Sequence, residues 1–314
     1  MMVWILFIAA ILVFLALDLG IFNKEAHVIK TKEAAAWTTV WVSIAIGFSV
    51  VIWWLFSNEL VANPTGLTPD SAVLKYITGY LIELSLSIDN VFVIAVIFNS
   101  FNTPKLYQHR VLFWGILGAI IFRAIMIVFG VALINKFDWI VYIFGLFLIY
   151  TAYKMLKSDD MEFNPKNSFV FRKTRKILPF TGFISGDKFF IRRMGKFIAT
   201  PLFMALLMIE LTDILFALDS IPAVLAITAD PFIVFSSNIL AILGLRSMYF
   251  LISQMLDKFR FINYSLVAIL TFVGFKMIFA HYIELPEWLS LTVIGLSLGA
   301  GIILSVMIPP KEKI

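Results

Sequence analysis

The sequence predicts an all-α polytopic membrane protein with nine transmembrane helices: an inverted repeat of two three-helix units plus three extra helices. Three observations predict it: the composition, the lengths of the apolar segments, and charged residues that recur inside them. Of the 314 residues, 61% are hydrophobic and only 14% are charged. A soluble domain is typically about half apolar, so the composition excludes an ordinary soluble protein. The lipid bilayer is therefore the first predicted partner.

Nine apolar segments are long enough to span a membrane, because a spanning helix needs about 20 mostly apolar residues. The first segment has no basic stretch before its apolar run and no small-residue cleavage site, so we interpret it as a retained helix and not as a signal peptide. The nine predicted spans are residues 2–22, 36–57, 72–99, 111–133, 138–156, 197–228, 232–256, 263–283 and 288–308.

The loops between these spans alternate in charge. Cytoplasmic loops are enriched in Lys and Arg, so the alternation predicts an outside N-terminus and a cytoplasmic C-terminus. The basic loops carry Lys24, Lys30 and Lys32, then Lys105 and Arg110, then Lys258 and Arg260, and finally Lys311 and Lys313. The acidic loops carry Glu59, Asp70, Asp138, Asp230, Glu284 and Glu287.

The most basic loop covers residues 157–196. We interpret it as a linker at the membrane surface; the alternative is a small ordered cap, because prolines and glycines punctuate it. The net charge of +5 does not indicate a nucleic-acid partner, since the basic residues lie in particular loops, as orientation signals do. The chain has no cysteine, which excludes disulfides, thiolate metal sites and cysteine nucleophiles.

Two acidic motifs recur inside the apolar sequence. One reads E-L-S-L-S-I-D-N-V from Glu83 and the other D-I-L-F-A-L-D-S-I from Asp213, so each has a carboxylate six residues before an Asp. Asp89-Asn90 in the first motif corresponds to Asp219-Ser220 in the second. Both motifs lie in the longest predicted spans.

Basic residues extend the correspondence downstream of each motif. Arg123 matches Arg246, and the later pair is Lys154 and Lys276. The first unit, residues 72–156, starts outside, whereas the second, residues 197–283, starts inside. Oppositely oriented repeats are typical of secondary transporters, which place their substrate near the midplane where the units meet.

Carboxylates at bilayer depth indicate a cation pathway, because each charge there costs about 2.5 to 3.5 kcal/mol on insertion scales. Oxygen ligands without His or Cys suit hard cations such as Mg²⁺, Ca²⁺ and Mn²⁺. The predicted metal ligands are Asp89, Asn90, Asp219 and Ser220, with Glu83, Glu210 and Asp213 completing the site or coupled to it. The predicted supporting residues are Arg123, Arg246, Lys154, Lys276 and Asp18.

Buried ion pairs that only fix helix packing are the alternative to an ion site. The acids of the two repeats outnumber the bases, which leaves a negative charge that packing does not require. Arg123 and Arg246 are expected to hold carboxylates in place and not to contact the ion. Asp18 is equally well explained as a solvated helix end. Pro222 frees the carbonyl of Leu218, so local unwinding is expected near the second motif and, more weakly, near the first.

At these motifs the sequence resembles the TerC family of integral membrane proteins. The resemblance is carried by A-L-D-L-G-I-F-N-K-E-A-H-V-I from Ala16, E-L-S-L-S-I-D-N-V-F-V from Glu83, Q-H-R-V-L-F-W-G-I-L-G-A from Gln108, E-L-T-D-I-L-F-A-L-D-S-I-P-A-V from Glu210 and N-I-L-A-I-L-G-L-R-S-M-Y-F from Asn238. The resemblance, which is to the bacterial branch of the family, implies export of Mn²⁺ from the cytoplasm. It also implies that the motif acids Glu83, Asp89, Glu210, Asp213 and Asp219 are transport residues.

The leading prediction is therefore not an enzyme but a secondary transporter. It exports a hard divalent ion, with Mn²⁺ as the transported substrate, in exchange for protons and without a tightly bound cofactor. The alternative is a non-transporting membrane scaffold that engages secretion or metal-delivery partners through its basic loop. The sequence around Asp89 and Asp219 speaks against an intramembrane aspartyl protease, because it lacks the Tyr-Asp and Gly-x-Gly-Asp pair of such enzymes.

Overall fold

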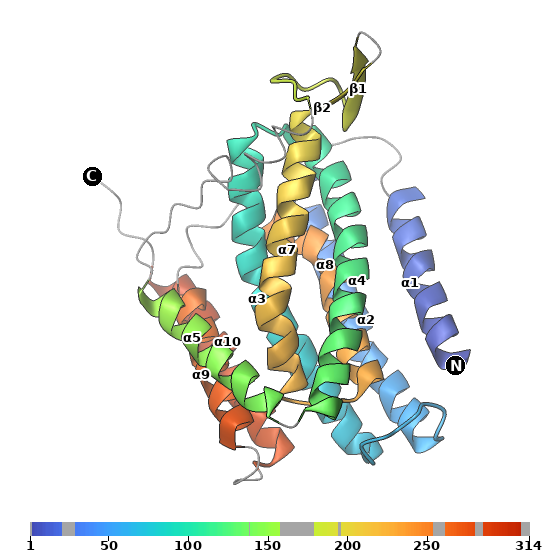
Figure 1. Cartoon of the computed structure of the whole chain (residues 1–314), viewed down its shortest axis with the longest axis vertical. Coiled ribbons are helices and arrows are strands. Elements are labelled where there is room, and N and C mark those ends of the chain that lie inside the picture. The colour runs from blue at the N-terminus through green and yellow to red at the C-terminus, as the bar shows by residue number, and fades with distance from the viewer. Residues whose placement is uncertain are drawn as a thin grey trace.

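The computed structural model is a bundle of helices with a short β-hairpin at one end (Figure 1). The structure describes residues 2–20, 29–137, 139–157, 179–193, 196–253, 261–279 and 285–308. Each of the predicted spans contains one helix. The elements in the described residues are α1 (Met2–Gly20), α2 (Thr31–Ser57), α3 (Pro69–Ser100), α4 (Lys105–Lys136), α5 (Ile140–Lys157), β1 (Phe190–Arg193), β2 (Lys196–Ala199), α7 (Pro201–Leu225), α8 (Pro231–Ile252), α9 (Ile262–Phe279) and α10 (Glu287–Met307).

In the described part of the chain, seven helices are long and apolar enough to cross a membrane. They are α2, α3, α4, α5, α7, α8 and α10. The described residues of α1 and α9 give shorter apolar stretches, Met2–Ala16 and Tyr264–Phe279. The chain is therefore a multi-pass helical membrane protein, and nine crossings stay a prediction.

The bundle exposes apolar side chains and buries polar ones, as lipid requires. Val50, Val128 and Leu296 are exposed by 68%, 71% and 69%, whereas the charged side chains of Glu83 and Arg123 are almost fully buried. Ionisable groups inside membrane proteins face the bundle interior because lipid cannot solvate them. The interior of this bundle is therefore where its chemistry lies.

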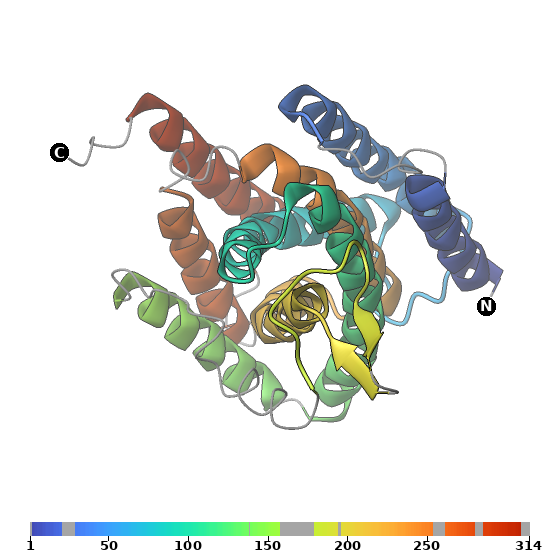
Figure 2. The ribbon, with the colours of Figure 1, turned by 90° about the horizontal axis from the view of Figure 1, so that it is seen from above.

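Helix α7 lies at the centre of the bundle, where α3 and α4 pack along it and α5 and α9 cover another side (Figure 2). Helices α5 and α9 cross closely at two glycines: a Cβ on either Gly145 or Gly274 would lie 2.9 Å from the backbone oxygen of the other. Helix α8 packs on α2, α3 and α4. The motif-bearing helices α3 and α7 are thus neighbours in the interior.

Polar residues followed by proline begin three of these helices. Thr68 caps α3 by accepting a hydrogen bond from the Ser71 amide at 3.3 Å. Asp230 caps α8 and accepts from the amides of Phe232 and Ile233, both at 3.0 Å. Thr200 precedes Pro201 at the start of α7. Proline suits the first helical position, since its missing N–H would have no partner there.

Both motif-bearing helices are continuous, so the predicted local unwinding is wrong. Helix α3 passes through Asp89 and α7 passes through both Asp213 and Asp219 without a break. Pro222 lies in the last turn of α7, where the helix ends shortly afterwards. The proline therefore does not interrupt the part of α7 that carries the motif.

Helix α7 is also shorter than the predicted span 197–228. Its 25 residues follow directly on β2, which takes up Lys196–Ala199, and Pro201 fixes its start. Helices α3 and α4 have 32 residues each. The expectation that the two motifs occupy the longest helices therefore holds for α3 and is wrong for α7.

Part of the basic loop forms an ordered cap over the start of α7 (Figure 1). β1 pairs antiparallel with β2, and the Thr200 hydroxyl donates to the carbonyl of Lys188 at 2.7 Å. Arg110 on α4 forms an ion pair with Asp187 and lies over the ring of Phe189. In the described residues of this loop, the alternative of a small ordered cap is therefore right and the linker is wrong.

Some predicted residues lie outside the described part of the structure. The structure describes the backbones of Asp18 and Asp89, which belong to α1 and α3, but it does not describe their side chains. The segment 158–178 of the basic loop is outside it as well. The loop residues wholly outside it are Lys24, Asp138, Lys258, Arg260, Glu284, Lys311 and Lys313.

Candidate cation site

A buried arginine joins the three central helices. Arg123 lies near the middle of α4 and is 1% exposed. Its Nη2 donates to Asp213 Oδ1 at 2.9 Å and its Nε to Asp213 Oδ2 at 3.3 Å. Its Nη1 forms an ion pair with Glu83 on α3. Two-point contacts between guanidinium and carboxylate are strong and directional, so Arg123 fixes both acids.

Two neutral side chains complete the shell around the guanidinium. Arg123 Nη1 lies 3.2 Å from Ser220 Oγ on α7 and 3.2 Å from Asn238 Oδ1 on α8. Both partners are buried. Asn238 was not among the predicted site residues. Its signal in the sequence is an amide inside an apolar helix, a type of residue that often hydrogen-bonds across membrane helices.

A polar stripe on α3 faces the same interior. Glu83, Ser87 and Asn90 follow the i, i+4, i+7 spacing that places residues on one face of a helix. They are exposed by 0%, 0% and 3%. Among the described residues, Glu83 Oε2, Ser87 Oγ and Asn90 Oδ1 have no hydrogen-bond partner. Native proteins leave few buried polar atoms unpaired, and each calls for a specific explanation.

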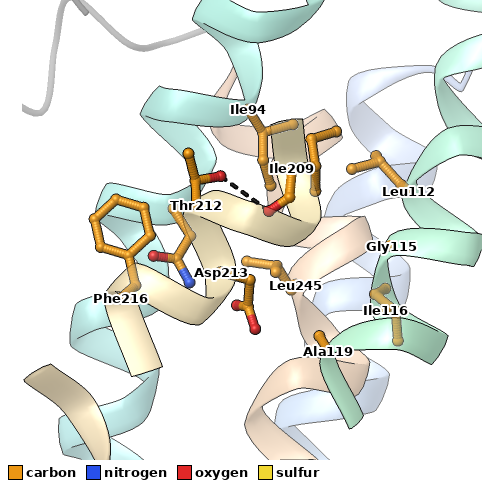
Figure 3. A pocket seen from close by; sticks show the side chains of 11 residues that line it. Ile94, Leu112, Gly115, Ile116, Ala119, Ile209, Thr212, Asp213, Phe216 and Leu245 are labelled. Carbon is orange, nitrogen blue, oxygen red and sulfur yellow. Dashed lines mark hydrogen bonds between the residues drawn. The ribbon is translucent and has the colours of Figure 1, made fainter. Parts of the chain in front are cut away.

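A small cavity lies beside Asp213 (Figure 3). Its volume is about 20 Å³, and roughly 10–15 Å³ is enough to hold one water molecule. Asn90, Thr212 and Asp213 form its polar lining, and apolar side chains from α3, α4, α7 and α8 form the rest. Figure 3 shows Asp213 beside Leu245 and Ala119. The cavity thus fits one water-sized guest next to a carboxylate.

The cavity lies on the hairpin side of Arg123. Helix α3 runs toward the hairpin end of the bundle, and α4 starts at that end (Figure 1). Asn90 follows Glu83 along α3, and Ala119 precedes Arg123 along α4. Arg123 therefore lies beyond the cavity, on the side away from the hairpin.

Glu210 adds a further carboxylate next to this cavity. It lies one helical turn before Asp213 on α7 and packs against Gly118 of α4, where an added Cβ would overlap its carboxylate. Glu210 Oε2 is buried, and in the described structure it has no hydrogen-bond partner. A larger residue at position 118 would force the Glu210 carboxylate to move.

Asp219 faces a different neighbour from Asp213. On a continuous helix, residues six positions apart point about 120° away from each other. Asp219 Oδ1 accepts a hydrogen bond from the Thr151 hydroxyl of α5 at 2.9 Å, and Lys154 on α5 attracts it electrostatically. The predicted ligands therefore fall into two places: Glu83, Asp213 and Ser220 surround Arg123, whereas Asp219 lies against α5.

A family model described as "Integral membrane protein TerC family" matches residues 68–313. The chain belongs to the TerC family. The matched region contains both acidic motifs and Arg123, and it confirms the resemblance seen in the sequence.

Relatives of this TerC protein match it over nearly its whole length. The uncharacterized membrane protein STKORF319 of Myxococcus xanthus is 49% identical over 304 residues, which are 97% of this chain and 92% of the relative. A protein of Escherichia coli strain K12, provisionally named membrane-bound redox modulator Alx, is 42% identical over 294 residues, or 93% of this chain and 90% of Alx. An uncharacterized membrane protein of Rickettsia bellii is 42% identical over 306 residues, covering 98% and 97%. No solved structure matches the chain.

The other predicted basic residues of this TerC protein lie away from the Arg123 cluster. Arg246 Nη1 lies 2.8 Å from His109 Nε2, between α8 and α4. Lys276 donates to Ser290 Oγ at 2.8 Å, between α9 and α10. The two arginines that correspond in the repeat therefore have different contacts, because Arg123 holds two carboxylates and Arg246 contacts an imidazole.

Among the side chains that the structure describes, no group of three or more His, Asp or Glu forms a metal site. The side chain of Asp89 is not among the described ones. Glu83 and Asp213 are both bound to Arg123, so the guanidinium stands where a cation held by these two acids would lie. Carboxylate, amide and hydroxyl oxygens are the available donors, and they suit a hard cation.

Proposed function

We propose that this TerC protein is a secondary transporter that exports a hard divalent metal ion, Mn²⁺, from the cytoplasm. The observation that carries the proposal is the small cavity at Asp213, whose polar lining also includes Asn90 and Thr212. A water-sized space beside a carboxylate and other polar side chains inside a membrane bundle suits a small, hard cation.

The charge around Arg123 favours a dication. Glu83 and Asp213 bind its guanidinium, and Glu210 lies one turn before Asp213, so three acids accompany one arginine and leave two formal negative charges when they are ionised. Packing alone would be served by equal numbers of acids and bases. An ion with two positive charges offsets the excess.

The helix packing supports an inverted repeat. Exchanging α3 with α7, α4 with α8 and α5 with α9 turns the α3–α8 contact into the α7–α4 contact, and it leaves the α5–α9 contact unchanged. Helices α3 and α7 run in opposite directions (Figure 1). Glu83 comes from one unit and Asp213 from the other, as expected for a site between inverted repeats. Nine crossings, with the N-terminus outside and the C-terminus cytoplasmic in the bacterial inner membrane, belong to this proposal.

Proton exchange completes the transport cycle that we propose. A carboxylate that binds the metal ion when ionised can carry a proton on the return step, so no enzymatic group and no bound cofactor is needed. The relative in E. coli is named a redox modulator, but this chain has no cysteine and therefore no thiol chemistry.

Ion flux in proteoliposomes tests the proposal. Mn²⁺, Ca²⁺, Mg²⁺ and Zn²⁺ should be compared across an imposed pH gradient, and we expect Mn²⁺ flux that the gradient drives. Asp213→Asn should lower the flux more than tenfold, because it removes the carboxylate at the cavity. Absence of Mn²⁺ flux in the wild type would contradict the proposal.

Mn²⁺ resistance in cells tests the two motif aspartates. Asp89→Ala and Asp219→Ala should lose protection against Mn²⁺ while the protein still reaches the membrane at normal levels. Unchanged resistance in both variants would remove these residues from the pathway.

A scaffold function remains the second candidate, favoured by the surface of the β-hairpin cap. Phe183, Phe190 and Phe197 are exposed by 52%, 41% and 68% in a basic segment. Exposed aromatic and basic residues suit contact with a partner protein. A deletion within Lys166 to Arg193 separates the two functions: a scaffold loses activity on this deletion and keeps it when the acids are replaced, whereas a transporter shows the reverse.

A further inference from the structure

We propose that Arg123 takes the place of the metal ion when the transport site is empty. Its guanidinium then binds Glu83 and Asp213, and it must release Asp213 for the metal ion to bind. The inference rests on the proposed transport function. It assigns to Arg123 a part in each transport cycle, beyond holding the acids in place.

The first argument is competition for the same oxygens. Both Asp213 oxygens are bound by Arg123, through Nη2 at 2.9 Å and Nε at 3.3 Å, and Asp213 is also the carboxylate in the wall of the cavity. A dication in the cavity would face the guanidinium across this one carboxylate. Like charges at such short range repel strongly in a buried site, so the two cations compete for Asp213.

The second argument is position. The cavity lies on the hairpin side of Arg123, which is the cytoplasmic side in the proposed topology. Arg123, bound to Glu83, Ser220 and Asn238 as well, lies farther from the hairpin than the cavity does. Asp219 follows Asp213 along α7 in the same direction, so an ion that moves from the cavity toward Asp219 passes the level of the guanidinium.

The third argument is that the guanidinium has neutral partners to keep. Ser220 and Asn238 both accept from Nη1 at 3.2 Å. If the metal ion takes Asp213, these two oxygens still hydrogen-bond the displaced group, which lessens the penalty for an unpaired buried arginine.

Metal binding and transport by Arg123 variants test the inference. In Arg123→Lys the buried positive charge remains, but an ammonium has three donors in place of a five-donor planar fork, so it competes less well for the acids. We expect Arg123→Lys to bind Mn²⁺ at least threefold more tightly and Arg123→Gln at least tenfold more tightly in equilibrium titrations of purified protein. Turnover in proteoliposomes should fall in both, because the bound ion is displaced more slowly.

Arg110 supplies the matched controls. It lies on the same helix and also pairs with a carboxylate, Asp187, but the pair is exposed by 43% and 53%. Arg110→Lys and Arg110→Gln should leave Mn²⁺ affinity and turnover unchanged.

Added guanidinium gives a readout that a positioning role would not move. Guanidinium chloride at non-denaturing concentrations should weaken Mn²⁺ binding to Arg123→Ala and partly restore its turnover, and it should leave the wild type unaffected. If Arg123→Gln and Arg123→Ala fail to fold, Arg123→Lys decides alone, since it keeps the buried charge.

The possible outcomes separate this inference from the proposed function. If the wild type neither binds nor transports Mn²⁺, the transport function itself fails. If the wild type transports Mn²⁺ but Arg123→Lys binds it more weakly than the wild type, Arg123 only positions the acids, and the inference is overturned while the transport function stands.

Discussion

At the scale of single residues, the site depends on side chains that fit because a neighbour is small or polar. Gly118 on α4 is the sharpest case, since an added Cβ there would overlap the carboxylate of Glu210 on α7. Glycine is normally unfavourable inside a helix, by about 1 kcal/mol relative to alanine. Its presence here is explained by the close approach of a buried carboxylate.

Gly118→Ala should therefore lower transport with little loss of stability. The methyl group must push the Glu210 carboxylate, the far end of a flexible side chain, away from α4, so its main effect is to displace the acid. Gly47→Ala on α2 is the matched control, because nothing lies within 4 Å of its added Cβ, and it should be neutral or slightly stabilising. Thermal midpoints in detergent and Mn²⁺ flux measure both effects. A Gly118→Ala variant as active as Gly47→Ala would show that Glu210 tolerates displacement.

Thr151→Val tests whether Asp219 depends on α5. The valine keeps the shape of threonine but removes the hydroxyl that donates to Asp219 Oδ1 at 2.9 Å. A hydrogen bond to a charged group contributes about 1.5–3 kcal/mol, so we expect a lower thermal midpoint and reduced Mn²⁺ flux. The control is Thr39→Val, where the lost bond goes to the carbonyl of Ala35 on the same exposed helix face. Equal effects of the two substitutions would remove Thr151 from the site.

The sequence allows some of these residues to be predicted and hides others. Glu83, Asp213 and Arg123 stand out because charges are rare inside spans, and Arg123 makes two bonds to Asp213. Thr151 and Asn238 are neutral, and their importance depends on which helix lies opposite. That information is a property of the packing, which no local pattern in one sequence contains.

At the scale of helices, the continuity of α7 decides how the acids are shared. The sequence predicts unwinding because one ion could not reach acids on opposite faces of a straight helix. The structure keeps α7 helical and gives the acids different neighbours: α4 for Asp213 and α5 for Asp219. The acids on α7 therefore do not converge on one site. Two places along one helix satisfy them without breaking backbone hydrogen bonds.

The crossing of α5 and α9 gives a prediction at this scale. Membrane helices associate closely where small residues meet, and here a Cβ on Gly274 would lie 2.8 Å from Ile149 Cγ1 and 2.9 Å from the Gly145 oxygen. Gly274→Ala should separate the helices and lower the thermal midpoint by an amount corresponding to about 1–3 kcal/mol. Gly295→Ala on α10, with nothing within 4 Å, should not. An unchanged midpoint for Gly274→Ala would mean that the crossing is loose.

At the scale of the whole molecule, hydropathy is enough to find each helix in the described residues, because each predicted span contains one. Hydropathy does not decide which of them cross the bilayer. Helices α1 and α9 fall short of a full span over their described residues, and α9 lies in the second of the two predicted repeat units. If α9 did not cross, the two units would no longer be related by inverted topology, and the C-terminus would lie on the other side.

Cysteine labelling in intact cells tests both the orientation and the crossing by α9. The chain has no cysteine of its own, so single cysteines can be introduced without altering other positions. The exposed positions Thr65 before α3, Lys188 in the cap and Ile308 after α10 suit the experiment. A membrane-impermeant maleimide should label Thr65→Cys in intact cells, and should label Lys188→Cys and Ile308→Cys only after the membrane is opened.

Labelling of Ile308→Cys in intact cells would show that α9 does not cross. Labelling of Lys188→Cys in intact cells would reverse the orientation and place the cavity on the external side of Arg123, so that the proposed direction of transport would fail with it.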